Sequence, residues 1–284
     1  MIRILAIMAI LLPVPGLAAE KFITLASTTS TQNSGLFDHI LPMFFADTGI
    51  GVRVVAVGTG QAIRIAENGD ADALLVHHRP SELAFIANGF GIERRDVMYN
   101  DFVIVGPGTD PAMVAAQPSA PTAFLAIAKA AQKFASRGDD SGTHKKEREI
   151  WAASGVVPSG EWYLETGSGM GATLNLSQSI NAYTLTDRGT WITFGNKGAL
   201  KLLYSGDPTL FNPYSIILVN PARYSHVKTD LARRFALWLV SDRGQSAIAE
   251  FRIERYQAFC PNATPQKALD EVKAVCPSPN PLDD

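Results

Sequence analysis

The stretch Ser136-Arg137-Gly138-Asp139-Asp140-Ser141-Gly142-Thr143-His144 places one arginine, two carboxylates and a Ser-Gly-Thr triplet directly before an amphipathic helical pattern. The backbone N–H groups in the first turn of a helix have no partner within the helix and carry a partial positive charge. The serine and threonine hydroxyls add further donors, and Arg137 adds a full positive charge. Together these features favour a binding site for an oxyanion.

Strand-like and helix-like patterns alternate before this stretch. Short apolar runs predict strands at residues 22–25, 52–57, 74–76 and 102–105, and helical patterns separate them. This order predicts a mostly parallel sheet covered by helices.

A second series of the same kind surrounds and follows the stretch. The pattern predicts helices at 118–135, 170–180 and 229 to about 249, and strands at 162–165, 182–185 and 214–219. The second α/β unit is inserted in the first, so we expect a two-lobed clamshell. Signals for a repeat of 20–50 residues are not visible.

The first residues have the pattern of a targeting signal. Arg3 precedes an apolar run at 4–12, and small residues at 16–19 offer a cleavage site. The run is too short for a permanent membrane span, and the absence of a cysteine near the cleavage site argues against a lipid anchor. We therefore expect a cleaved signal peptide at 1–19 and a soluble, exported protein in a Gram-negative periplasm.

The composition is that of an ordinary globular protein, with 46% hydrophobic and 18% charged residues. A chain of 284 residues has room for two domains. The net charge of −2 gives no reason to expect nucleic-acid binding. An anion site in this chain must therefore come from the local arrangement of donors and positive charge, and not from the overall charge of the protein.

Cys260 and Cys276 are the only cysteines, and both lie near the C-terminus. In an oxidising compartment we expect them to form a disulfide. Such a bond would add about 3 kcal/mol of stability in the chain-entropy model. The alternative is a pair of free thiols.

Four turns that precede helical patterns carry small polar residues or glycines. They are residues 27–31, 58–61, 141–143 and 167–171. In open α/β sheets such turns lie at the carboxyl ends of strands, where ligands bind. Each turn could serve only as a helix cap, but four together favour a shared ligand cleft.

A dinucleotide site and a metal site are two other interpretations, and both carry less weight. Gly167-x-Gly169-x-x-Ala172 matches a dinucleotide pattern, but Asp187, at the spacing of a ribose-binding acid, reads as a helix cap. Adjacent His77 and His78 point to opposite sides of a strand end and lack a third ligand at metal spacing, which favours a structural or cleft-rim role over a metal site.

Ser141 and His144 could mimic a hydrolase pair, but no third orienting group is evident. Arg137 could simply form a surface ion pair with Asp139 or Asp140. The two carboxylates would repel an anion, so we expect them to orient Arg137 or to balance the empty site.

Seven segments, in order over almost the whole mature chain, resemble the periplasmic tungstate-binding proteins of tungstate-uptake ABC transporters. They are residues 27–35, 57–62, 67–72, 98–107, 136–147, 170–175 and 182–189. The resemblance implies an α/β type II periplasmic binding protein fold, with two lobes joined by two crossover strands at 101–105 and 214–218. It implies lobe I at 20–102 and 214–284, and lobe II at 103–213.

The resemblance also implies where the oxyanion binds. One lobe would supply Thr28, Thr29 and Thr59, and the other Arg137. The remaining implied ligand residues are Ser141, Gly142, Thr143, Gly169, Met170, Gly171 and Ala172. The chain departs from the family pattern at Ser27, where Thr is usual, at Asn33, where Asp is frequent, and at His78-Arg79, which add charge near the rim.

The implied function is a binding protein, not an enzyme, that captures tungstate and delivers it to an ABC permease at the inner membrane. The implied protein is a monomer without a cofactor, and its metal enters only as the oxyanion. Tungstate has no proton to donate at neutral pH, so donors and positive charge suffice, whereas a protonated phosphate would need an acceptor. Molybdate, sulfate or phosphate as ligand, and an exported Ser/His hydrolase, remain the alternatives.

Overall fold

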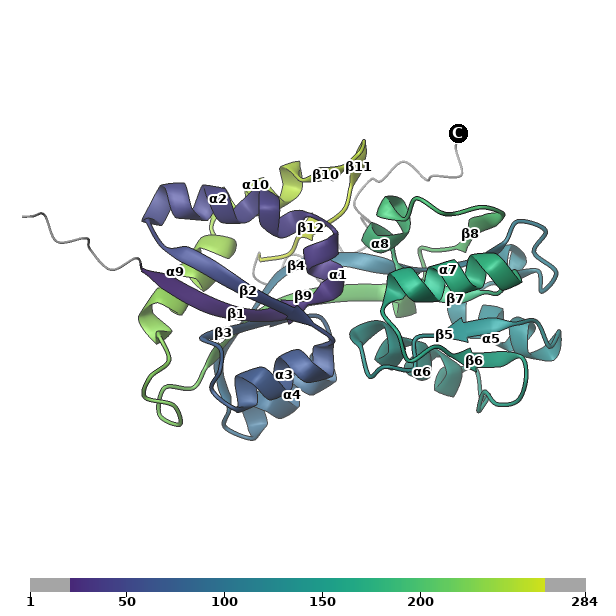
Figure 1. Ribbon diagram of the computed structural model, residues 1–284, viewed down its shortest axis with the longest axis horizontal. Coiled ribbons are helices and arrows are strands. Elements are labelled where there is room, and N and C mark those ends of the chain that lie inside the picture. The colour runs from purple at the N-terminus through teal and green to yellow at the C-terminus, as the bar shows by residue number, and fades with distance from the viewer. Residues whose placement is uncertain (1–20, 264–284) are drawn as a thin grey trace, which may run out of the picture.

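The computed structural model describes residues 21–263, and in it two lobes lie side by side with long strands running between them (Figure 1). Lobe I contains β1 (Phe22–Thr28), α1 (Thr29–Asn33), α2 (Leu36–Thr48), β2 (Gly51–Val57), α3 (Thr59–Glu67), β3 (Ala73–Val76), α4 (Arg79–Ala87), β9 (Phe211–Val219), α9 (Thr229–Leu239), α10 (Asp242–Glu250), β10 (Arg252–Ile253), β11 (Tyr256–Gln257) and β12 (Cys260–Pro261). The strand β4 (Gly91–Pro107) reaches into both lobes.

Lobe II contains the middle of the chain. Its elements are η1 (Val114–Ala116), α5 (Ala120–Lys129), β5 (Phe134–Ser136), α6 (Gly142–Ala153), β6 (Tyr163–Glu165), α7 (Met170–Ile180), β7 (Thr184–Asp187), α8 (Arg188–Thr193), β8 (Leu200–Tyr204) and η2 (Pro208–Leu210). The boundaries expected from the sequence, 20–102 with 214–284 and 103–213, remain our proposal for the two lobes.

The sheet of lobe I has the order β12-β4-β9-β3-β1-β2. Strands β1, β2 and β3 are parallel, whereas β9 is antiparallel to both β3 and β4. The prediction of a mostly parallel sheet is therefore wrong at the crossover strands. Strand β9 enters this sheet from lobe II, after η2, and not through a helix that crosses from a neighbouring strand of lobe I, so it can run antiparallel to β3 and β4.

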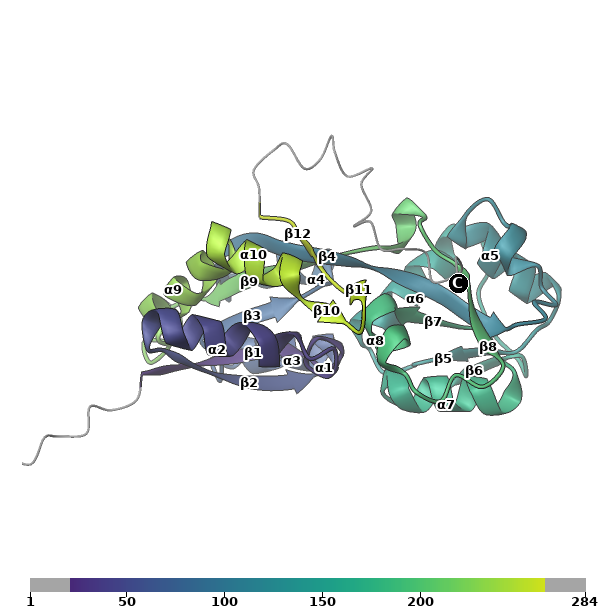
Figure 2. The ribbon, with the colours of Figure 1, turned by 90° about the horizontal axis from the view of Figure 1, so that it is seen from above.

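Alternating side chains of the lobe I strands enter two separate cores. Leu75 and Ile216 pack in a core with α2, α9 and α10 on one face. Leu74 and Ile217 pack with α3 and α4 on the other face. The period of two in a strand accounts for this alternation, and Figure 2 shows the helix layers from above.

Lobe II is built in the same way around the C-terminal half of β4. Phe102 and Ile104 pack in a core with α5 and α6, and Val103 and Val105 in a core with α7, α8 and β8. Strands β7 and β8 pair antiparallel with β4, while β5 and β6 pair parallel.

The boundaries of two predicted helices are wrong. The helix expected at 118–135 ends at Lys129, because Ala131 takes a left-handed conformation (φ 47°) and β5 follows. The helix expected from 229 to about 249 is divided into α9 and α10, because the Ser241 hydroxyl caps a new helix. A Cβ on Gly244 would lie 2.1 Å from the carbonyl oxygen of Trp238, so α10 packs against the end of α9 closely enough to require glycine.

Some predictions fall wholly or partly outside the described residues. The signal peptide at 1–19 lies outside them, as does Cys276. Cys260 is buried in β12 and is not a free cysteine, and its pairing with Cys276 stays a prediction. Within residues 21–263, the helices lack the length and apolar character needed to cross a membrane.

Candidate functional site

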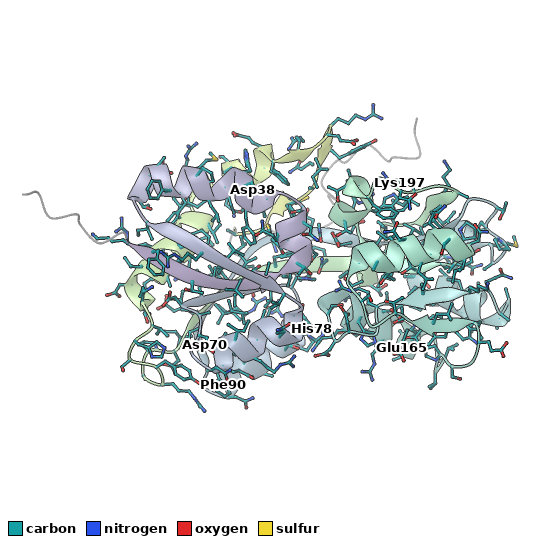
Figure 3. All side chains as sticks on the ribbon, viewed as in Figure 1. Asp38, Asp70, His78, Phe90, Glu165 and Lys197 are labelled. Carbon is teal, nitrogen blue, oxygen red and sulfur yellow. The ribbon has the colours of Figure 1, made fainter. Side chains whose placement is uncertain are left out.

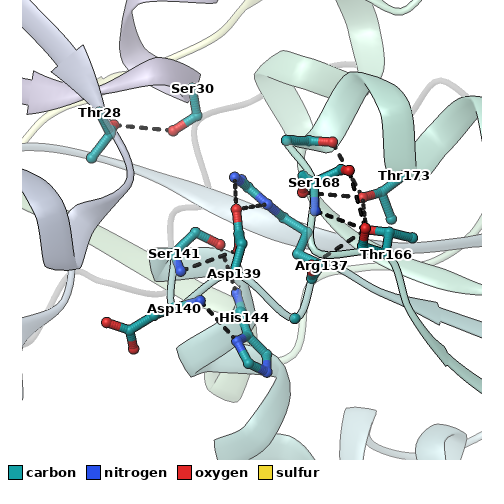
Figure 4. Close-up of polar contacts among 12 residues, drawn as sticks. Thr28, Ser30, Arg137, Asp139, Asp140, Ser141, His144, Thr166, Ser168 and Thr173 are labelled. Atoms are coloured by element: carbon teal, nitrogen blue, oxygen red, sulfur yellow. Dashed lines mark hydrogen bonds and ion pairs between the residues drawn. The ribbon is translucent and has the colours of Figure 1, made fainter.

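The turn between β5 and α6 presents Arg137 and the first residues of α6 between the two lobes (Figure 4). Gly138 (φ 61°) and Asp140 (φ 57°) both adopt left-handed conformations and reverse the chain here. Ser141 caps α6 by accepting a hydrogen bond from the backbone N–H of His144 at 3.2 Å. Gly142 and Thr143 then form the buried first turn of the helix.

Arg137 is only 5% exposed although it carries a full charge. Its Nε and Nη2 groups donate to one oxygen of Asp139, at 3.1 and 2.5 Å. The other oxygen of Asp139 accepts from the backbone N–H of Ser141 at 3.2 Å. Asp139 therefore orients Arg137, as predicted, and leaves the remaining guanidinium N–H groups available. Asp140 pairs with Lys145 instead, at 3.2 Å.

Lobe I contributes hydroxyl groups at two helix starts. Thr28 ends β1 and caps α1, and its Oγ1 lies 3.1 Å from the hydroxyl of Ser30 and 2.7 Å from that of Thr31. Thr29, which is partly buried, begins α1. Figure 4 shows Thr28 and Ser30 on the lobe I side and Arg137 on the lobe II side.

Thr59 is the first residue of α3 and is 1% exposed. Among the described residues its hydroxyl has no hydrogen-bond partner. An unpaired buried hydroxyl costs about 1–3 kcal/mol, so its position requires an explanation. A ligand that accepts a hydrogen bond at this point supplies one.

The two lobes are in close contact beside Thr59. A Cβ placed on Gly142 would lie 3.0 Å from Thr59 Oγ1 and 2.6 Å from His77 Cε1. A Cβ placed on Gly60 would lie 2.3 Å from a carboxylate oxygen of Asp140. The N-termini of α3 and α6 thus face each other at short range, so both helix dipoles favour an anion here.

The turn before α7 lies next to Arg137 but is more open. The Ser168 backbone N–H donates to the carbonyl oxygen of Arg137 at 3.2 Å, and the Thr166 hydroxyl donates to the same oxygen at 3.3 Å. Met170 is buried, whereas the other three predicted ligand residues of this turn are exposed: Gly169, Gly171 and Ala172. Of the four turns, this one has the most exposed residues.

His77 is a buried neighbour of the site, for which the sequence favoured a structural or cleft-rim role and not that of a ligand residue. Its ring stacks on Tyr214 with centroids 4.6 Å apart, and its Nδ1 lies 2.8 Å from Asn212 Oδ1. Burial lowers the pKa of His77 to about 4, and the charge of Arg137 also lowers it, against the hydrogen bond that the ring donates to Asn212. His77 is therefore neutral at pH 7. Its only sequence signal was its place at a strand end.

The structure argues against the other readings of these residues. The His144 imidazole accepts from the Asp140 backbone N–H at 3.1 Å, so it is not directed at the Ser141 hydroxyl as a general base. Asp187 caps α8 by accepting from Thr190, so it is not free for a ribose. Among residues 21–263 there is no group of three or more His, Cys, Asp or Glu side chains that could hold a metal ion.

Comparison with known proteins shows extensive similarity. The chain matches the family model of the PBP superfamily domain over residues 14–243. It is 45% identical to the tungstate-binding protein TupA of Peptoclostridium acidaminophilum, over 86% of this chain and 87% of that protein.

Two solved structures extend this similarity. The tungstate-binding protein TupA from Desulfovibrio alaskensis is 44% identical with a TM-score of 0.76, over 86% of this chain and all (100%) of that chain. The tungstate ABC transporter structure from Geobacter sulfurreducens is 47% identical with a TM-score of 0.76, over 82% of this chain and 100% of that chain. The predicted type II periplasmic binding protein fold is confirmed. By its sequence and its fold, the chain belongs to the TupA family of tungstate-binding proteins, within the PBP superfamily.

Proposed function

We propose that this protein captures tungstate in the periplasm and delivers it to the permease of an ABC transporter. The relatives named above are tungstate-binding proteins or part of a tungstate ABC transporter, which supports this proposal. These are binding and transport proteins, so the chain is a receptor and not an enzyme.

One observation carries the proposal: a buried arginine, and a buried threonine hydroxyl without a hydrogen-bond partner among the described residues, flank a pair of facing helix N-termini. Arg137 is 5% exposed and Thr59 is 1% exposed. Both present hydrogen-bond donors, as do the first N–H groups of α3 and α6. A tetrahedral oxyanion is the ligand that uses all of these donors together.

The proposed ligand residues come from both lobes. Thr28, Thr29 and Thr59 would bind from lobe I. Ser141 accepts from a backbone N–H through its oxygen, so its own proton remains available to donate. The proposed lobe II residues are Arg137, Ser141, Gly142, Thr143, Gly169, Met170, Gly171 and Ala172.

The donor set favours an anion that carries no proton. Tungstate and molybdate are dianions without a proton at neutral pH, and hydrogen bonds from a charged donor are about twice as strong as neutral ones. The carboxylate of Asp139 is already occupied by Arg137 and Ser141. With three of its roughly four acceptor sites used, this carboxylate has little capacity to accept from a protonated phosphate, which supports an unprotonated dianion.

Location and assembly are part of the same proposal. The charge and apolar pattern of residues 1–19 supports export to the periplasm. The partner would be an inner-membrane permease that recognises the loaded form, and we propose that the protein acts as a monomer. Light scattering during gel filtration, with and without tungstate, measures the mass that tests this last point.

Titration calorimetry against tungstate, molybdate, sulfate and phosphate in turn tests the function. We expect tight binding of tungstate, and weak or no binding of sulfate and phosphate. Molybdate serves as the closest competitor in shape and charge. A protein that binds phosphate but not tungstate would overturn the proposal.

A further inference from the structure

His78 and Glu149 join the two lobes at the rim of the site, away from the proposed ligand residues. His78 immediately precedes α4 in lobe I, and Glu149 lies in α6 of lobe II. His78 Nε2 is 3.3 Å from Glu149 Oε1, a contact between residues 71 positions apart in the chain. In Figure 3, His78 lies at the edge of lobe I that faces lobe II.

The hydrogen bonds around His78 fix which ring nitrogen faces Glu149 as a donor. Nδ1 accepts from the Ser81 backbone N–H at 3.3 Å and lies 2.6 Å from the Ser81 hydroxyl. In the neutral ring one nitrogen accepts and the other donates. Nε2 therefore carries the proton and donates to Glu149, so the contact does not require a protonated histidine.

Glu149 is held ready to accept this hydrogen bond. Its other oxygen pairs with Lys146 at 3.0 Å, one turn earlier in α6. The hydrogen bond from His78 is the largest cause that lowers the pKa of Glu149, to about 2. The carboxylate is thus charged over the whole physiological range.

The position of Glu149 in α6 connects this contact with the ligand site. Gly142 and Glu149 are seven residues apart, close to two helical turns at about 3.6 residues per turn. They therefore lie on the same face of α6, which is turned to lobe I. Gly142 approaches Thr59 and His77, and Glu149 meets His78 two turns further along.

We propose that His78 and Glu149 form a latch across the lobes that stabilises the closed form and slows the release of the bound anion. The proposal rests on the function proposed above. Because the latch is made only when the lobes meet, it favours the closed state without touching the ligand. The contact between His78 and Glu149 would thus lengthen the time for which the anion stays bound.

The substitution His78→Asn tests the latch, because asparagine still caps α4 but is too short to reach Glu149. Glu149→Ala removes the other partner. Glu161→Ala, which removes an exposed carboxylate from lobe II, controls for net charge. Stopped-flow release of tungstate and calorimetry give the rate constants and the Kd for each variant and for the double variant.

We expect each latch variant to raise the dissociation rate and the Kd by about threefold to fivefold, the range for a partly exposed pair. The association rate should stay unchanged, and the double variant should be no worse than the single ones. Equal dissociation rates in the variants and the wild type, or fully additive effects, would overturn the latch.

A second readout does not depend on tungstate. The latch variants should populate the open form more than the wild type, which small-angle scattering reports as a larger radius of gyration without added anion. A wild type that does not bind tungstate would contradict the proposed function alone. Unchanged scattering together with unchanged release would contradict the latch alone.

Discussion

Lobe I and lobe II bring different chemistry to the same site. Lobe I presents neutral hydroxyl groups, of which that of Thr59 is buried and has no hydrogen-bond partner in the described part of the chain. Lobe II presents the charge of Arg137, held by Asp139, and the capped N-terminus of α6. A dianion would therefore gain most of its electrostatic stabilisation from lobe II and would complete its hydrogen bonds only when lobe I closes over it.

The buried titratable groups His77 and Glu147 do not add to this difference in charge between the lobes. In lobe I, burial lowers the pKa of His77 to about 4. In lobe II, burial raises the pKa of Glu147 to about 7, against hydrogen bonds donated by Tyr163 and Trp151. Both shifts favour the neutral form, so neither group adds a full charge near the site at mildly acidic pH.

Removal of the lobe II charge should have the largest effect. Arg137→Ala should weaken tungstate binding by about 2–5 kcal/mol, because a buried dianion loses its charged partner. Titration calorimetry measures the change. Arg137→Lys, which keeps the charge but not the planar fork of donors, should recover part of it. An unchanged Kd in Arg137→Ala would show that lobe II does not hold the anion through this residue.

A substitution that sterically blocks the contact between the lobes should have the second-largest effect on tungstate binding. Gly142→Ala places a methyl group 2.6 Å from His77 Cε1, and such overpacking costs about 1–3 kcal/mol. The cost should appear in the Kd for tungstate and not in the melting temperature of the unliganded protein, because the lobes can open. Gly195→Ala, in lobe II and outside the proposed ligand residues, is the matched control, since nothing lies within 4 Å of its Cβ position.

Stability should depend on pH in opposite directions in the two lobes. The pKa of folded His77 lies below its unfolded value of 6.5, so its contribution is complete above pH 6.5 and is lost as the pH falls toward 4. Between pH 6.5 and 5 this loss amounts to about 2 kcal/mol. Urea unfolding across this range measures it, and His77→Gln should flatten the dependence.

Glu147 should lower the stability of the folded protein as the pH rises, and not as it falls. Its folded pKa lies above its unfolded value of 4.5. Its contribution is therefore complete below pH 4.5 and is lost as the pH rises through 7. Glu147→Gln should remove this alkaline loss, and an alkaline limb identical to that of the wild type would contradict the assignment.

Removal of the Thr59 hydroxyl from lobe I should have the smallest of these effects on tungstate binding. Thr59→Val keeps the shape of the side chain but removes its donor, and it should weaken tungstate binding by about 1 kcal/mol. Because the hydroxyl has no hydrogen-bond partner within residues 21–263, the same substitution should leave the unliganded protein as stable or more so. Thr59→Ser is the control that keeps the donor. A loss of stability with unchanged binding would mean that the hydroxyl serves the fold.

Local signals in the sequence were sufficient for most elements near the site. The cap at Ser141 and the helix from Met170 to Ile180 were predicted as they occur, because a cap and an apolar period act within a few residues. Strand β5 was missed, because three residues after an Ala-rich helix give no periodic signal. The length of β4 was underestimated, because its first half contains charged residues such as Arg94 and Arg95.

Contacts between distant segments could not be predicted in this way. The stacking of His77 on Tyr214 and the hydrogen bond of His78 to Glu149 join residues that no local pattern relates. The antiparallel pairing of β9 with β3 is of the same kind. Family resemblance indicated which turns form the site, but it could not indicate which donors already bond to protein groups, because those bonds depend on the three-dimensional packing.

The strand β4 has a mechanical consequence for ligand release. It is one continuous strand from Gly91 to Pro107, paired in both sheets, and its register shifts between Ile92 and Arg95, between Asp96 and Met98, and between Ile104 and Val105. From Met98 to Asp101 its pairing with β9 runs without a shift. When one lobe rotates relative to the other, the paired strands β4 and β9 must therefore twist. The energy needed to open the lobes should then rise gradually with the opening angle.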